Sequence, residues 1–364
     1  MNSPIRFSIV GSGWRSLYYV RIAKAMPDVF RLCGMLCRSA EKAEKISEAY
    51  GIPTFTSEED MLREKPDFIV VAVDKAHVAE VSIHYLDLGC PVLSETPTAL
   101  DKETVVKLWE YHKKGAKLII AEQYRNYPLH HARKQLIEKG YIGTPNYLYL
   151  SEAHEYHGVS LMRMYLNLNP EVHYRISARS YPFPVTETLS RYEAYADGRI
   201  AEKKRTLATF TFENGSVCLY DFDSEQYRSK IRYNTLRVLG ERGEIFGNRI
   251  RYLNEENAAE EKELNVSYSI SETDESNPNL HTVKEITQIR LDDQILYEPL
   301  FGIRHLAEDE TAIATLLYRM GKYVLDQGEE PYPLIEALSD AYAAILLKEA
   351  IATGREISFE DILK

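Results

Sequence analysis

The sequence predicts a two-part fold of the α/β and α+β classes. Residues 1–122 are expected to form a parallel sheet covered by helices, and residues 123–364 an open, mostly antiparallel sheet. In the first part, strand-like and helix-like segments alternate, which is typical of parallel sheets. After residue 122, strand-like runs follow one another, and Asn214-Gly215 between two of them is a strong hairpin signal.

The first strand, 7–10, ends at the turn Gly11-Ser12-Gly13 and leads into a helix expected at 17–25. Gly11 allows a sharp backbone turn, and Gly13 leaves room for a pyrophosphate to approach. The helix would direct its unpaired amides and positive dipole end at that phosphate. Ser16 stands where a third glycine would complete the dinucleotide pattern. Since Gly-x-Gly alone is weak evidence, an ordinary strand–helix turn is the alternative.

The remaining elements of the first part follow in regular order. Strands are expected at 31–36, 53–56, 67–73, 91–94 and 117–121, and helices at 41–50, 78–88 and 101–114. The run 67–73 is almost entirely apolar, as a strand buried on both faces must be. Sheets of this kind bind ligands at the carboxyl ends of their strands, so we expect a nucleotide there.

The second part is richer in strands. They are expected at 147–153, 172–180, 206–213, 216–221, 235–239 and 244–250, with two closing helices at 307–326 and 333–353. The acidic stretch 255–279 is poor in large apolar residues and is interpreted as a solvated excursion, with disorder as the alternative. An open sheet exposes apolar surface, which favours self-association as a homodimer or homotetramer.

Composition excludes several classes of function. The net charge of −11, without any basic stripe, argues against nucleic acid as the main partner. The four cysteines have neither CxxC nor metal-ligand spacing, so we expect reduced thiols, no metal and a cytoplasmic protein. The first residues lead directly into a strand, and neither a signal peptide nor a membrane span is expected.

Several motifs, taken together, resemble the glucose-fructose oxidoreductase / inositol dehydrogenase / MocA (Gfo/Idh/MocA) family over nearly the whole chain. They are the Gly11-Ser12-Gly13 turn, the run 67–73 followed by His77, the strand end 93–97, the segment 123–128 (Gln-Tyr-Arg-Asn-Tyr-Pro), the segment 140–143 (Gly-Tyr-Ile-Gly) and the helix start at His157. The resemblance implies a Rossmann domain that holds a nicotinamide cofactor. It also implies a second domain that offers its sheet to a small-molecule substrate, usually a sugar, a polyol or a derivative.

The resemblance further implies a cofactor pocket at the strand ends. Its members would be Gly11, Gly13, Trp14, Arg15, Arg38, Ser39, Val73, His77, Glu95, Thr96, Pro97 and Arg125. The second strand ends in Cys37-Arg38-Ser39, without the carboxylate that would repel a 2′-phosphate. Arg38 can pair with such a phosphate, so the sequence favours NADP slightly over NAD.

The family pattern Glu-Lys-Pro reads Glu95-Thr96-Pro97 in this chain. The family's lysine lies beside nicotinamide and substrate and assists proton loss from the reacting hydroxyl. Thr96 offers only a hydroxyl, with no charge at neutral pH. Lys75, after the fourth strand, is a candidate replacement, and a solvated loop lysine is the alternative reading.

The second catalytic motif also departs from the family. The family often has an Asp and, four residues later, a His; here the positions hold Ala153 and His157. His157 can act as acid or base because imidazole titrates near neutral pH, and Tyr156 is a second candidate. The expected substrate contacts are Tyr124, His154 and Arg163. A structural histidine and a solvated arginine are the alternatives for His157 and Arg163.

Two functions follow as hypotheses. The first is an NAD(P)-dependent oxidoreductase acting on a sugar, polyol or glycoside, with hydride transfer that is either net or borrowed and returned. The missing lysine makes the second form more attractive. The alternative is a catalytically silent nucleotide-binding sensor or regulator of the same fold.

Overall fold

The computed structural model describes residues 3–273 and 281–363 and divides into two compact units. The first comprises the chain up to Asn126 together with Asp309–Tyr342, and the second comprises Tyr127–Glu308 and Ala343–Ile362. The sequence-based division instead assigned everything after residue 122 to the second domain. Residues 309–342 group with the first unit because they pack there: a Cβ at Gly321 would lie 2.5 Å from the Ile5 side chain.

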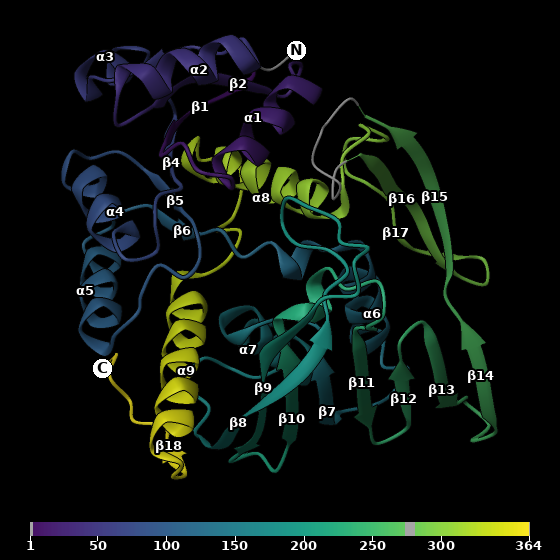
Figure 1. Cartoon of the computed structure of the whole chain (residues 1–364). Helices are drawn as coiled ribbons and strands as arrows, with labels where there is room; N and C mark the ends of the chain where they lie inside the picture. Colours follow the sequence, from purple (N-terminus) through teal and green to yellow (C-terminus); the bar gives the residue numbers. More distant parts are fainter. Residues whose placement is uncertain (1–2, 274–280, 364) are drawn as a thin grey trace. The chain divides into compact units, whose positions relative to one another are not determined.

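The first unit contains a six-stranded, fully parallel sheet in the order β3-β2-β1-β4-β5-β6 (Figure 1). Its strands are β1 (Ile5–Val10), β2 (Phe30–Leu36), β3 (Thr54–Phe55), β4 (Phe68–Val71), β5 (Val92–Ser94) and β6 (Leu118–Ile120). The helices are α1 (Ser16–Ala25), α2 (Ala40–Tyr50), α3 (Glu58–Arg63), α4 (Val78–Asp87), α5 (Lys102–Lys113) and α8 (Glu308–Val324), the last beginning one residue before this unit. All four residues of β4 are buried, which confirms the interpretation of its apolar run.

Local sequence explains where several helices begin and end. Ser39 caps α2 by accepting a hydrogen bond from the Lys42 amide, and Gly51 ends that helix in the left-handed conformation. Asp101 caps α5 in the same way at 2.7 Å from the Thr104 amide, as predicted. The helix α3 was not predicted, although Ser57 caps it and three acidic residues fill its first turn.

The second unit contains a nine-stranded sheet in the order β14-β13-β12-β11-β7-β10-β9-β8-β18 (Figure 1). Its strands are β7 (Pro145–Ser151), β8 (Tyr174–Thr186), β9 (Ile200–Phe212), β10 (Val217–Asp223), β11 (Thr235–Gly240), β12 (Gly243–Phe246), β13 (Arg249–Leu253), β14 (Ala259–Glu263) and β18 (Ile357–Ser358). Only β7 and β10 pair in parallel. The predicted fold class is therefore confirmed.

Helices cover one face of this sheet. Here α7 (Glu155–Leu166) packs on β7, and α6 (Pro128–Glu138) packs on α7 and on the strands 282–291 and 294–297, while α9 (Leu334–Thr353) contributes residues to both units. Burial alternates along β10: Cys218, Tyr220 and Phe222 are buried, whereas Leu219 remains 36% exposed. The sheet therefore has a covered face and an open one, as an antiparallel sheet permits.

The acidic stretch 255–279 differs from its interpretation as an excursion. It forms β14 and β15 (Asn265–Glu272), and β15 pairs with β16 (Thr282–Leu291), which pairs in turn with β17 (Gln294–Tyr297) in a small sheet. Cross-strand charge pairs stabilise the exposed β13–β14 hairpin, for example Arg251 with Glu261 at 2.7 Å. Residues 274–279 of the stretch lie outside the described residues.

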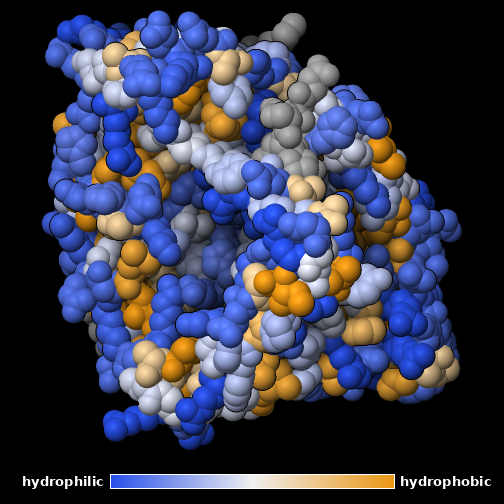
Figure 2. All heavy atoms as spheres, in the orientation of Figure 1, coloured by the Kyte–Doolittle hydropathy of each residue, from blue (hydrophilic) through white to orange (hydrophobic). Residues whose placement is uncertain are grey.

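On the side seen in Figure 2, hydrophilic side chains predominate and hydrophobic ones are scattered among them. Among the described residues, we find no helix that combines the length and apolar character needed to cross a bilayer.

Candidate functional site

The turn after β1 has the geometry that a bound pyrophosphate requires. Gly11 has a φ of +109°, and a Cβ there would lie 2.3 Å from the Ala72 carbonyl oxygen at the end of β4. A Cβ at Gly13 would meet nothing within 4 Å. Gly11 is therefore fixed by close packing, whereas Gly13 borders open space, and the role of Gly13 toward a pyrophosphate stays a prediction.

The start of α1 presents backbone donors rather than a side-chain cap. Within residues 3–273 and 281–363, no side chain caps this helix, and its first turn contains no acidic residue. The Ser16 hydroxyl donates to the Ala72 carbonyl at 3.3 Å, so it ties α1 to β4. The Leu17 and Tyr18 amides donate to the Trp14 and Arg15 carbonyl oxygens at 3.2 Å, so an anion would bind the amides that precede Leu17. The residues present thus fit the pyrophosphate of a dinucleotide.

Arg15, predicted to contact phosphate, lies between two carboxylates. Its guanidinium is 2.8 Å from Asp309 and 3.5 Å from Glu95, and 23% of its side chain is exposed. Burial lowers the Arg15 pKa, but the two carboxylates more than offset this and raise it above its ordinary value. A phosphate would have to share this arginine with Asp309. Trp14 packs edge-on against Tyr18, with ring centroids 4.6 Å apart.

Glu95 of the Glu-Thr-Pro motif faces into the unit. It is buried, and the Tyr19 hydroxyl donates to its Oε1 at 2.5 Å. Burial and this carboxylate together raise the pKa of Tyr19. The Thr96 amide lies 3.3 Å from Glu95 Oε2, and the peptide bond between Thr96 and Pro97 is cis. Glu95 therefore connects the end of β5 to α1.

The loop after β4 is exposed. Lys75 and His77 are both exposed, and Val73 is half-buried. His77 occupies the cap position of α4, but its side chain makes no capping hydrogen bond. The Asp74 carboxylate instead accepts from the Ala76 amide at 2.9 Å.

The three residues that follow β2, Cys37, Arg38 and Ser39, lie in different environments. Cys37 is buried, and burial raises the pKa of its thiol. Arg38 is exposed, and the Ser39 hydroxyl caps α2 as described above. An exposed guanidinium at this strand end is available to a phosphate.

The turn η1 (Tyr124–Asn126) follows β6, the last strand of the parallel sheet. Arg125 forms an ion pair with Glu336 at 2.6 Å and lies over the ring of Tyr332, 5.0 Å from its centroid. The Tyr124 amide donates to the Glu122 carboxylate at 2.9 Å. Among the described atoms, the predicted contact residue Arg125 thus has a carboxylate partner within its own unit.

The second group of predicted residues lies at the start of α7, in the second unit. His154 is the cap residue of this helix, and Glu155 follows with a φ of +31°. The Glu155 amide donates to the Tyr220 hydroxyl at 2.8 Å, and its carboxylate binds Lys348 at 2.7 Å. These contacts fix a backbone conformation that non-glycine residues seldom adopt.

The two histidines of this helix start lie against one another. The rings of His154 and His157 are 4.9 Å apart and nearly perpendicular. His154 is half-buried, whereas His157 and Tyr156 are buried. Arg163, near the end of α7, directs its guanidinium to the Leu168 carbonyl at 3.4 Å. The structure therefore groups His154, Tyr156 and His157, and places Arg163 at the other end of the helix.

A buried polar cluster supports the same strand end. His130 Nδ1 contacts the Tyr165 hydroxyl at 2.7 Å, and its Nε2 lies 3.3 Å from Glu152. Arg133 binds the other oxygen of Glu152 at 3.4 Å. Burial, opposed in part by Glu152, lowers the pKa of His130 to about 4, so this ring is neutral at pH 7.

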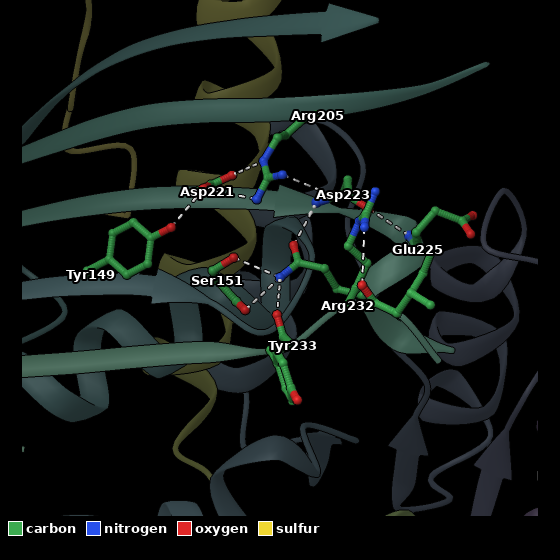
Figure 3. Close-up of polar contacts among 10 residues, drawn as sticks. Tyr149, Ser151, Arg205, Asp221, Asp223, Glu225, Arg232 and Tyr233 are labelled. Carbon is green, nitrogen blue, oxygen red and sulfur yellow. Dashed lines mark hydrogen bonds and ion pairs between the residues drawn. The ribbon is translucent and has the colours of Figure 1, made fainter. Parts of the chain in front are cut away.

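Sequence reasoning did not identify Tyr227, which contacts His154. It lies at the end of the turn η2 (Ser224–Tyr227), whose capping box joins Asp223 and Gln226. Figure 3 shows Ser151, Asp223 and Tyr233 around this turn. The spacing Asp223-x-x-Gln226 is a readable capping signal. Tyr227 and its partner His154, however, are 73 positions apart in the sequence.

Within the described residues, no group of three or more His, Cys, Asp or Glu side chains has metal-binding geometry.

Comparisons with known proteins agree with this geometry. Residues 5–123 match the model of the Gfo/Idh/MocA family, described as an oxidoreductase family with an NAD-binding Rossmann fold. No curated protein matches the sequence.

Solved structures match along the whole chain. One is an oxidoreductase from Agrobacterium radiobacter in complex with NAD+, L-tartaric acid and magnesium (TM-score 0.67, 13% identity, 98% of each chain covered). Another is the WlbA dehydrogenase from Bordetella pertussis with NADH and UDP-GlcNAcA (TM-score 0.66, 18% identity, 99% of each chain). A third is apo scyllo-inositol dehydrogenase from Lactobacillus casei (TM-score 0.65, 14% identity, 98% of each chain).

At these identities, the solved structures establish the fold. The family match confirms the predicted enzyme class and nicotinamide cofactor. Over residues 5–123, which include the Gly11 turn and the start of α1, the chain is similar to the NAD-binding Rossmann domain of the Gfo/Idh/MocA oxidoreductases.

Proposed function

We propose that the protein oxidises or reduces a sugar, a polyol or a glycoside with NAD(P) as cofactor. The observation that carries this proposal is the helix start of α7, where His154, Tyr156 and His157 gather beside the open-faced sheet of the second unit. Imidazole and phenol groups suit the hydroxyl-rich substrates of such enzymes. The WlbA complex with UDP-GlcNAcA and the inositol dehydrogenase of the same fold support this substrate class.

The residues have distinct tasks in this proposal. The amides after Gly11 and at the start of α1 bind the pyrophosphate, and Gly13 leaves space for it. A nicotinamide held there would accept a hydride from a carbinol carbon or supply one to a carbonyl carbon. His157, with Tyr156 as the second candidate, exchanges the hydroxyl proton. Tyr124, His154 and Arg163 remain the proposed substrate contacts.

The substitution of lysine by Thr96 shapes the reaction. Thr96 can donate or accept a hydrogen bond but cannot serve as a base at neutral pH. Lys75 is exposed in the loop after β4, so it is available as a replacement base. If no base replaces the lysine, a borrowed hydride that is later returned fits better, because the transient ketone acidifies a neighbouring C–H bond and permits elimination or epimerisation.

The test is a panel of sugars, polyols and glycosides incubated with cofactor and read by mass as well as by absorbance. Conversion with a net absorbance change at the nicotinamide band supports net oxidation, and conversion without one supports the borrowed hydride. His157→Ala should abolish either reaction. Lys75→Ala should slow turnover at least tenfold without loss of stability, because Lys75 is exposed. Undiminished turnover in Lys75→Ala would remove Lys75 from the mechanism.

We propose that the protein slightly prefers NADP to NAD. Arg38 is exposed at the end of β2, and the nearby Glu41 is engaged with Lys45 at 2.7 Å. Arg38→Ala should therefore weaken NADPH binding about tenfold while leaving NADH binding nearly unchanged. The matched control is Arg31→Ala, which removes an exposed arginine from the start of the same strand. Equal losses of affinity for NADPH and NADH in Arg38→Ala would contradict the proposed preference for NADP.

A silent sensor of the same fold is the second candidate, and Thr96 is the observation that favours it. Cofactor binding without conversion of any compound in the panel would favour this reading. Turnover that disappears in His157→Ala would exclude it.

Self-association and location are also proposed. The open face of the second sheet carries Leu207, Leu219 and Tyr181, which are 41%, 36% and 50% exposed. We expect a homodimer or homotetramer that covers this face, and Leu219→Lys should shift sedimentation toward smaller species. A wild-type monomer would contradict this.

The four cysteines are free thiols, which supports the proposed cytoplasmic location. Fractionation of the source cells would test the location, and secreted or membrane-bound protein would contradict it.

A further inference from the structure

Tyr227 places one oxygen atom against two nitrogens of His154. The backbone N–H of His154 donates to the Tyr227 hydroxyl oxygen at 2.9 Å. The ring Nδ1 of His154 contacts the same oxygen within hydrogen-bonding distance. A single phenol therefore meets both the main chain and the side chain of the residue that begins α7.

The direction of these hydrogen bonds follows from the groups involved. A backbone N–H can only donate, so the phenol oxygen accepts there. The phenol keeps a hydrogen of its own, which it can direct at Nδ1, the ring nitrogen within hydrogen-bonding distance. A neutral imidazole carries one ring hydrogen, and with Nδ1 accepting, that hydrogen is on Nε2.

The turn that carries Tyr227 is itself held firmly. Asp223 is buried; its Oδ1 accepts from the Glu225 amide, and its own amide donates to Gln226 Oε1, both at 3.0 Å. The Gln226 side-chain amide donates to the carbonyl and hydroxyl oxygens of Ser151 at 2.9 and 2.7 Å, and to the Tyr233 carbonyl at 3.3 Å (Figure 3). Ser151 ends β7, three residues before His154.

Charge and ring packing complete the arrangement. Arg205 bridges the two aspartates of β10: it lies 3.6 Å from Asp223 and also contacts Asp221 (Figure 3). The Tyr227 ring packs edge-on against Phe222, with centroids 5.0 Å apart. The phenol thus has one position relative to the His154 ring, and paired strands of the same sheet supply both partners.

We propose that Tyr227 is a positioning residue that keeps the ring hydrogen of His154 on Nε2, so that His154 donates a hydrogen bond to an oxygen of the substrate. The tautomer rests on the geometry alone. The role toward the substrate rests on the proposed function. His157, edge-on against His154, then remains available for proton exchange.

The tautomer is tested on the full-length protein without cofactor, by ¹⁵N NMR of histidine-labelled samples at neutral pH, with His154→Gln to assign the signal. In the wild type, the His154 signal should show Nε2 protonated and Nδ1 as an acceptor. Tyr227→Phe keeps the ring against Phe222 but removes the hydroxyl, and it should shift the Nδ1 resonance and admit the second tautomer.

The matched control is Tyr233→Phe, which removes a hydroxyl from a side chain that is 92% exposed in the adjoining loop. It should leave the His154 signal unchanged. A wild-type His154 protonated on Nδ1, or a Tyr227→Phe spectrum equal to that of the wild type, would overturn the inference.

Kinetics separate this inference from the proposed function. With any substrate that the panel yields, Tyr227→Phe should lower kcat/KM about tenfold, the value of one hydrogen bond, and Tyr233→Phe should not. If the spectra agree but no compound is converted, the proposed function fails and the tautomer stands. If turnover occurs and Tyr227→Phe equals the wild type, the positioning role fails while the proposed function stands.

Discussion

The turn after β1 and the start of α7 are built in opposite ways. In the turn, the backbone itself is the proposed binding element, and the nearby charged side chains already pair with one another: Arg15 lies between Asp309 and Glu95. At α7, side chains form the site, and residues distant in the sequence position them. Tyr227 contacts His154, and Tyr220 and Lys348 hold Glu155.

This difference indicates which kind of substitution should impair each site. A backbone site needs space and conformational freedom, so a single methyl group can destroy it. A side-chain site needs its hydrogen-bond partners, so the loss of one hydroxyl should impair it while the fold remains. Three predictions follow, from the largest expected effect to the smallest.

Gly11→Ala should destroy the backbone site. The added Cβ would lie 2.3 Å from the Ala72 carbonyl oxygen at a φ of +109°, so we expect a loss of about 3 kcal/mol in the free energy of unfolding. Calorimetry should show cofactor affinity lowered more than a hundredfold. Gly13→Ala is the control: nothing lies within 4 Å of its Cβ, so stability should change by less than about 0.5 kcal/mol. Equal stability of the two variants would contradict the assigned roles.

The cluster behind the side-chain site should make stability depend on pH. The pKa of His130 is about 4 in the folded protein, below its unfolded value of 6.5. As pH falls from about 6.5 to 4, the unfolded chain takes up a proton that the native ring does not, so stability should fall. The loss is at most about 3 kcal/mol.

Denaturant unfolding at pH 7 and pH 4.5 measures this loss. His130→Gln should reduce the difference between the two pH values. The control His173→Gln alters an exposed histidine and should keep it. If His130→Gln keeps the full difference, His130 is not its source.

Asp309→Asn should have the smallest effect and act in two directions. Removing the carboxylate 2.8 Å from Arg15 should cost about 1 kcal/mol of stability, because both side chains are partly exposed. It should also strengthen cofactor binding about two- to fivefold, because Arg15 is then no longer paired with a carboxylate at position 309 and attracts the phosphates of the cofactor more strongly. Thermal melts and cofactor titration measure the two effects. Weaker cofactor binding would show that Arg15 does not face the phosphates.

The same contrast explains what could be predicted from the sequence. The β4 run, the Gly11 turn, the Asp101 cap and the Asn214-Gly215 hairpin are local signals, and all four were identified correctly. The strand β14 was missed because cross-strand charge pairs, rather than apolar alternation, accompany it. The strand β15 does alternate, with Val266, Tyr268 and Ile270 on one face, and this signal was overlooked within the acidic stretch.

The candidate site was only partly predictable for the same reason. His154, Tyr156 and His157 are neighbours in sequence and were placed together. Tyr227, 73 residues from His154, and Asp309, 294 residues from Arg15, act through long-range contacts that no local pattern encodes. The exposed Lys75 and Arg38 could be located in their loops, but their roles await experiment.

The central claim is that the turn after β1 binds the pyrophosphate of a nicotinamide dinucleotide. Isothermal titration calorimetry of the purified protein with NADH and NADPH, repeated on Gly11→Ala, tests it most directly. The account predicts saturable binding of at least one of them to the wild type and none to the variant at the same concentrations. No heat of binding from either cofactor, or equal affinity in Gly11→Ala, would contradict it.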